Sequence, residues 1–348
     1  MKFFSEDIVD TIRSGSLTAE RSGELSPEVL SYIYDQRLFK LFVPEALNGE
    51  AMCLPKAIKI FEESAYIDGS FGWLVTIGSG GGYFAPIFAP DIAEKHFSPA
   101  NAVVAGSGHT TGRAQPVDGG YRVTGSWKYC SGSVYATIFT ANCLLPDGTV
   151  RSFIFTPDQV HIARDWDAYG LKATGSHTIS VADVFVPESM TFDIAAGDRH
   201  HDHAVYHYPF LQFAEASFTA VNAGICMHFF EEALAAVELH KTPETSQRYH
   251  FVHDLITQQQ ALLTAAREHF YEAVEKSWEA VMHDKVISQN TLAEVSHTAK
   301  NLTKTALSTA QTVYPYLGLS VTMERNPINR CWRDLHTASQ HILLKTFE

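Results

Sequence analysis

The chain has 348 residues, of which 45% are hydrophobic and 19% are charged, a composition typical of globular rather than disordered proteins. Its net charge of −13 argues against nucleic acid or an anionic membrane as the main partner, because both bind basic surfaces. The five cysteines are widely spaced and form no CxxC pair. We therefore expect no disulfide framework, no structural zinc site and a reducing, cytoplasmic location.

The first part of the chain, up to about residue 97, has the pattern of several helices. Ser26-Pro27-Glu28 reads as an N-cap, a first-turn proline and an early acid, and apolar residues follow it at helical spacing. Residues 55–65 and 90–97 predict further short helices. Residues 71–90 carry no charge, but they contain several glycines and prolines. We interpret them as a buried helix followed by a loop, with Gly78 to Gly82 in that loop, and expect no membrane span.

The period changes to two between residues 101 and 187. Residues 119–124 and 178–185 alternate in polarity, and Pro146-Asp147-Gly148 marks a turn between apolar runs. This pattern predicts a small β-barrel or sandwich. From residue 210 the helical period returns, in segments at 210–240, 248–283, 290–313 and 327–346, with breaks at Pro243, near 286–288 and at 315–327.

We therefore predict an α+β protein in three parts. Residues 1–100 form an N-terminal helical domain, residues 101–205 a central small β-barrel, and residues 206–348 a C-terminal four-helix bundle.

Three sequence segments occur in this order along the chain: Gly120 to Gly132, Asp167 to Ser176 leading into Val184 to Glu188, and Gly318 to Asp334. With this domain order, they resemble the acyl-CoA dehydrogenase superfamily over nearly the whole chain. Three segments are similar to the corresponding segments of its flavin-dependent monooxygenases. They are Trp127-Lys128-Tyr129-Cys130-Ser131-Gly132, Gly170 to Ser176 and Ser70-Phe71-Gly72-Trp73. The resemblance implies an acyl-CoA dehydrogenase-like fold.

It further implies the oxygenase component of a two-component monooxygenase. Such a protein receives reduced FAD or FMN from a separate flavin reductase and hydroxylates an aromatic or heteroatom substrate through a flavin hydroperoxide. The resemblance, together with long apolar helices, also implies a homotetramer.

The dehydrogenase reaction needs a carboxylate base, and neither family position carries one. The position nine residues after Arg333 is Ile342, and the alternative position, seven residues before Gly224, is Ser217. Glu215 lies two residues from the second position, on another face of a helix. We therefore expect no acyl-CoA dehydrogenase activity.

The resemblance implies three candidate catalytic residues. His341 has the spacing of a histidine in the related monooxygenases, and an imidazole can deprotonate a phenol or hydrogen-bond the oxygen adduct. Ser131 is placed beside the reactive nitrogen of the flavin. His109, after Gly106-Ser107-Gly108, is a candidate substrate ligand. For each, a structural histidine or a turn serine is the alternative.

The cofactor candidates implied by the resemblance are Trp127, Tyr129, Ser131, Thr174, Ser176 and Arg248. Core packing is the alternative for the two aromatic residues and turn chemistry for the hydroxyls, whereas Arg248 stands where dehydrogenases carry a pyrophosphate ligand. The tract from Asp198 to His207 is rich in histidine, but we interpret it as a linker and predict no metal.

Two other functions stay open from the sequence. One is an acyl-CoA dehydrogenase-like enzyme with a displaced base, and the other is a non-catalytic, flavin-binding scaffold.

Overall fold

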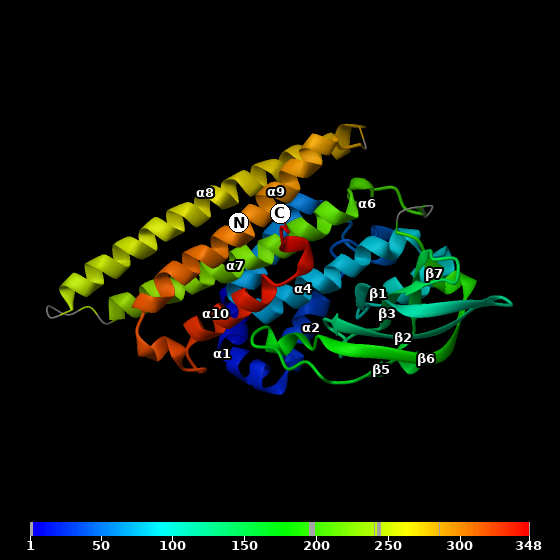
Figure 1. Cartoon of the computed structure of the whole chain (residues 1–348), viewed down its shortest axis with the longest axis horizontal. Helices are drawn as coiled ribbons and strands as arrows, with labels where there is room; N and C mark the ends of the chain where they lie inside the picture. Colours follow the sequence, from blue (N-terminus) through cyan, green and yellow to red (C-terminus); the bar gives the residue numbers. More distant parts are fainter. Residues whose placement is uncertain (1–2, 195–198, 240, 242–244, 285, 348) are drawn as a thin grey trace.

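The structure is a computed structural model that describes residues 3–194, 199–239, 241, 245–284 and 286–347. Figure 1 shows long helices running side by side, with a twisted sheet near one end of them and shorter helices from both ends of the chain beside the sheet. The predicted order, helices followed by strands and then by helices, is confirmed.

The N-terminal helices match the predicted pattern. Ser26 caps the second helix, since its hydroxyl accepts the backbone N–H of Val29 at 3.3 Å. The bounds are α1 Glu6–Ser22, α2 Pro27–Asp35, α3 Leu54–Ile67, α4 Gly69–Gly81 and α5 Pro90–Phe97, with short 3₁₀ turns η1 Glu45–Leu47 and η2 Gly82–Ile87.

The predicted loop at Gly78 to Gly82 is wrong, because α4 continues to Gly81. The cause is packing. A Cβ added to Gly78 would lie 2.3 Å from the ring of Phe39, and one added to Gly81 would lie 2.5 Å from Val104. The glycines therefore serve close contacts of a buried helix rather than turns.

The region of alternating polarity forms one seven-stranded sheet in the order β5-β6-β2-β1-β3-β4-β7. All neighbours are antiparallel except β1 and β3, which are parallel. Closure into the predicted small barrel stays a prediction. The strands are β1 Val104–Val117, β2 Gly120–Cys130, β3 Ile138–Leu144, β4 Val150–Phe155, β5 His161–Ile162, β6 His177–Pro187 and β7 Thr191–Phe192, with 3₁₀ turns η3 Pro157–Gln159, η4 Lys172–Thr174 and η5 Glu188–Met190.

The C-terminal helices also follow the prediction closely, apart from the last. They are α6 Ala204–His207, α7 Phe210–Leu239, α8 Ser246–Asp284, α9 Gln289–Val313 and α10 Pro327–Ala338, with 3₁₀ turns η6 Tyr314–Tyr316, η7 Leu319–Thr322 and η8 Ile342–Leu344. The expected end of the first segment at 240 and the break at Pro243 lie outside the described residues.

The final helix is shorter than predicted. It ends at Ala338 rather than near residue 346, and the chain then turns so that His341 is the N-cap of η8. His341 therefore lies on a turn at the end of the helix, not within it.

Among the described residues, α7 alone is long and apolar enough to cross a membrane, and 61% of its most apolar stretch is buried inside the protein. This burial is typical of a core helix. Small residues let α7 and α4 approach α3: a Cβ on Gly224 would lie 2.1 Å from the Glu62 carbonyl oxygen, and one on Gly72 would lie 2.4 Å from Ala65. This close packing brings Phe218 of α7 against Trp73 of α4, with stacked rings 5.4 Å apart.

Candidate active site

The end of strand β2 presents the first candidate residues. The pairing of β2 with β6 is interrupted between Trp127 and Cys130, and within this bulge Tyr129 has a φ of 66°. A non-glycine residue in the left-handed region is strained, and such strain often marks a functional site. The side chain of Tyr129 is 61% exposed, whereas Ser131, two residues later, is 6% exposed.

Three buried hydroxyls and one indole form a continuous chain of hydrogen bonds. Trp73 Nε1 donates to Ser131 Oγ at 2.9 Å. Ser131 Oγ lies 2.7 Å from Ser176 Oγ, which lies 2.6 Å from Thr174 Oγ1. Thr174 Oγ1 is also 2.8 Å from the carbonyl oxygen of Leu171. The structure thus brings together three of the predicted cofactor residues.

Helix α10 fixes the turn that carries two of these hydroxyls. Asp334 accepts the backbone N–H of Leu171 at 2.6 Å, and Arg333 donates to the carbonyl of Tyr169 at 3.1 Å while pairing with Glu20. Leu171 has a φ of 52°, so the turn depends on such contacts for its strained conformation. Burial and the neighbouring carboxylate of Asp68 raise the pKa of the Asp334 carboxyl.

His341 lies near Trp73 and Phe218. Its ring centroid is 4.1 Å from that of Phe218 and 6.2 Å from that of Trp73. Burial lowers the pKa of the imidazole to about 4, and the charge of the nearby His109 lowers it as well. At neutral pH His341 is therefore uncharged. Its Nδ1 accepts the backbone N–H of Leu343 at 3.4 Å, which leaves the ring hydrogen on Nε2.

His109 comes from the irregular part of β1, where the register with β3 shifts between Ser107 and Gly112. Its ring lies 6.4 Å from that of Tyr129, which in turn is 6.3 Å from Trp166. The three predicted catalytic residues, His341, Ser131 and His109, are thus connected through aromatic neighbours into one site.

Two predicted cofactor residues are not part of this cluster. Trp127 is fully buried in the core of the sheet, where Nε1 donates to the carbonyl of Asn142 at 2.9 Å. These contacts favour core packing over a cofactor contact. Arg248 donates to the carbonyl of Tyr316 at 3.0 Å, near the start of α8, and that end of α8 lies far from the sheet (Figure 1).

The three residues relevant to dehydrogenase chemistry have different surroundings. Glu215 is buried on α7 and pairs with Lys300 at 3.3 Å, so its carboxylate is directed towards α9. The hydroxyl of Ser217 donates to the carbonyl of Phe213 in its own helix. Ile342 is 55% exposed on η8.

The described part of the histidine-rich tract contains no clustered ligands. His207 pairs with Asp202 at 2.7 Å, and His203 caps α6. No group of three or more potential metal ligands occurs among the described residues. Asp198 lies outside them.

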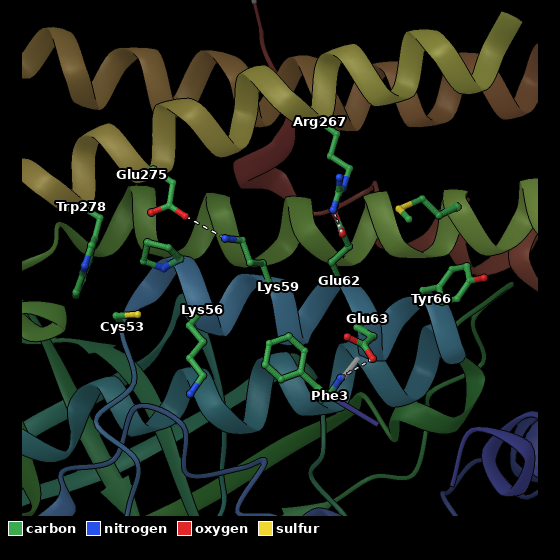
Figure 2. A pocket seen from close by; sticks show the side chains of 12 residues that line it. Phe3, Cys53, Lys56, Lys59, Glu62, Glu63, Tyr66, Arg267, Glu275 and Trp278 are labelled. Carbon is green, nitrogen blue, oxygen red and sulfur yellow. Dashed lines mark hydrogen bonds and ion pairs between the residues drawn. The ribbon is translucent and has the colours of Figure 1, made fainter. Parts of the chain in front are cut away.

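A cleft with a volume of about 810 Å³ lies elsewhere, between α3, α7 and α8. Figure 2 shows Lys59 pointing towards Glu275 and Arg267 towards Glu62, and these ion pairs measure 3.1 and 2.7 Å. None of the predicted site residues lines this cleft. We therefore assign the site from the chain of hydroxyls and not from the size of a cavity.

Three aromatic residues of the site were not predicted as functional. Trp73 and Phe218 come from helices α4 and α7, and Trp166 precedes the turn at 169–171, donating from Nε1 to the Leu171 carbonyl at 3.0 Å. Tryptophan and phenylalanine on apolar helices are usually core residues, so their pattern carried no signal of a site.

The chain is similar to known proteins in both sequence and fold. Residues 217–346 match the family "Acyl-CoA dehydrogenase, C-terminal domain". The chain is 27% identical to the indole-3-acetate monooxygenase of Pseudomonas putida, over 97% of this chain and 89% of that protein. It is 24% identical to the flavin-dependent monooxygenase oxygenase subunit HsaA of Mycobacterium tuberculosis, over 97% and 89%.

Solved structures agree in fold. The 3-HSA hydroxylase of Rhodococcus sp. RHA1 superposes with a TM-score of 0.92 at 20% identity, covering 98% of this chain and 92% of that one. FMN-bound TdsC of Paenibacillus sp. A11-2 gives a TM-score of 0.81 at 19% identity, covering 97% and 92%. The predicted resemblance to the acyl-CoA dehydrogenase superfamily, and within it to the flavin-dependent monooxygenases, is confirmed.

Proposed function

Because the relatives of this chain are oxygenases that use flavin, we propose that it is the oxygenase component of a two-component flavin-dependent monooxygenase. The observation that carries the proposal is the buried chain Trp73–Ser131–Ser176–Thr174, connected through Trp73 to the uncharged imidazole of His341. A separate flavin reductase is the transient partner. The substrate is a small aromatic or heteroatom compound, as the printed names of the relatives suggest.

The donor set of the site fits a flavin ring. Ser131 offers a hydroxyl, and the exposed face of Tyr129 together with Trp166 offers aromatic surface for a flat ring system. Bound reduced flavin supplies the electrons that activate oxygen. The protein's own part is to orient the ring, to hold hydrogen bonds at its edge and to exclude water. FAD and FMN both remain candidates.

We infer a specific role for His341. Its pKa of about 4 makes it uncharged at pH 7, and the Leu343 contact leaves a hydrogen on Nε2. His341 then acts as a hydrogen-bond donor to substrate or to bound oxygen, whereas base catalysis would require the other tautomer. His109, which is exposed and close by, is proposed to contact the substrate from the sheet side.

The remaining assignments concern the oligomer, the domains and the cellular location. We propose a homotetramer in which Arg248, remote from Ser131 of its own chain, serves the flavin phosphate of a neighbouring copy. We also propose that the chain divides into an N-terminal helical domain (1–100), a small β-barrel (101–205) and a four-helix bundle (206–348). The five free thiols support a cytoplasmic location.

The experiment is a coupled assay with a flavin reductase, NADH, and FMN or FAD, in which a panel of phenols and indoles is tested for hydroxylated product and for hydrogen peroxide. His341→Ala removes a hydrogen-bond donor and should lower product formation by ~10²–10³ while flavin affinity is retained. Ser131→Ala should instead raise the share of peroxide. Absence of product with every substrate, in a protein that binds no reduced flavin, would contradict the proposal.

A further inference from the structure

The distances in the chain of hydroxyls limit which group can donate a hydrogen bond to which. A hydroxyl carries one hydrogen and two lone pairs, whereas an indole nitrogen only donates. Ser131 therefore accepts from Trp73 in any arrangement. Thr174 Oγ1 lies within hydrogen-bond distance of two acceptors, the Leu171 carbonyl at 2.8 Å and Ser176 Oγ at 2.6 Å, but has only one hydrogen to give.

Two arrangements satisfy the chain. In the first, Thr174 donates to Leu171, Ser176 donates to Thr174, and Ser131 donates to Ser176. Ser131 then has a free lone pair and no free hydrogen. In the second, Thr174 donates to Ser176 and Ser176 donates to Ser131. The hydrogen of Ser131 is then free for an acceptor on a ligand.

In the second arrangement the Leu171 carbonyl keeps other donors, whereas the hydrogen of the buried Ser131 has no partner until a ligand supplies an acceptor. The Leu171 carbonyl still accepts from Trp166 Nε1 at 3.0 Å and from the backbone N–H of Thr174 at 3.2 Å. Reversal therefore costs one hydrogen bond between neutral groups. The first arrangement is preferred unless an acceptor stands beside Ser131.

Thr174 is 0% exposed and Ser176 is 4% exposed. Ser131, at 6% exposed, is buried almost as deeply, so the order of contacts and not burial separates their roles. Ser176 contacts Ser131 and Thr174 contacts Ser176, and we assign Ser176 and Thr174 as positioning residues that act through Ser131.

We propose that Trp73, Ser131, Ser176 and Thr174 form a hydroxyl relay that distinguishes reduced from oxidised flavin. This inference rests on the proposed function and on the family resemblance, which implies that Ser131 lies beside the reactive ring nitrogen. That nitrogen carries a hydrogen in reduced flavin and a lone pair in oxidised flavin. Reduced flavin therefore fits the preferred arrangement, whereas oxidised flavin requires the reversed one, so the relay favours the reduced form.

Thr174→Val tests the relay because valine keeps the shape of threonine and removes the hydroxyl. It abolishes the bond to Leu171 that opposes reversal, so the variant should bind oxidised FMN or FAD more tightly by ~2–10-fold. Its affinity for reduced flavin should change by less than that. Ser176→Ala should act in the same direction, since it also frees the hydrogen of Ser131. Thr174→Ser is the matched control and should bind as the wild type does.

The measurement is equilibrium binding to the full chain, by flavin absorbance and fluorescence for the oxidised forms and under anaerobic conditions for the reduced forms. In a Ser131→Ala background, Thr174→Val should no longer alter the affinity for oxidised flavin. Circular dichroism melting shows that each variant is folded.

Weaker or unchanged binding of oxidised flavin by both Thr174→Val and Ser176→Ala would overturn the relay and leave the proposed function standing. An effect of Thr174→Val that persists without the Ser131 hydroxyl would also overturn it. A wild-type protein that binds neither form of flavin would overturn the proposed function, and the relay with it.

Discussion

The uncharged state of His341 makes the stability of the protein depend on pH in a calculable way. The folded pKa of about 4 lies below the 6.5 of an unperturbed histidine. Folding therefore favours the neutral form, and the contribution is fully present above pH 6.5. It is lost as the pH falls from 6.5 towards 4, because protonation then favours the unfolded chain.

The magnitude follows from the two pKa values. At pH 5 the unfolded histidine is almost fully protonated and the folded one is not, which lowers the free energy of unfolding by about 2 kcal/mol relative to pH 8. Below pH 4 the loss levels off at about 3 kcal/mol.

The assay is urea unfolding of wild type and His341→Gln at pH 8 and pH 5. Glutamine cannot take up a proton, so the variant should lose about 2 kcal/mol less than the wild type over this interval. His161→Gln, at an exposed residue of the edge strand β5, is the matched control and should follow the wild type. Parallel pH dependence of the wild type and His341→Gln would show that His341 is not held neutral by burial.

Three further outcomes are expected. Asp334→Ala removes the acceptor of the Leu171 N–H and should destabilise the protein by about 1–3 kcal/mol in urea unfolding, whereas Asp334→Asn keeps an acceptor and should cost less. Acyl-CoA thioesters should not bleach the bound flavin under anaerobic conditions. Bleaching that is lost in Glu215→Gln would show that this carboxylate is the base after all. Light scattering should give a particle of about four times the 38.6 kDa chain mass, and a monomer would refute the tetramer.

Much of the fold was predictable because its signals are local. The capping serine before Pro27, the alternation in β2 and β6, and the long apolar sequence of α7 each depend on neighbours in the sequence. The errors came from tertiary packing. Gly78 and Gly81 lie within a helix where Phe39 and Val104 leave no room for a Cβ, and no local pattern could show these contacts.

The site was predictable only in part, for a similar reason. Ser131 comes from one motif and Thr174 and Ser176 from another, and the structure places them in hydrogen-bond contact. Trp73 is 58 residues away from Ser131 in the sequence and was noted only as part of the segment Ser70 to Trp73. In the structure it nevertheless donates to Ser131. Contacts between elements distant in the chain follow from helix packing rather than from residue type.

The central claim is that this chain binds reduced flavin and controls its reaction with oxygen. Stopped-flow absorbance during the reoxidation of reduced FMN and FAD, with and without the protein, tests it most directly. We predict that with the protein present oxygen is consumed before oxidised flavin appears, so that the reaction has at least two separate optical phases. A single phase with the rate of free flavin, for both FMN and FAD, would contradict the account.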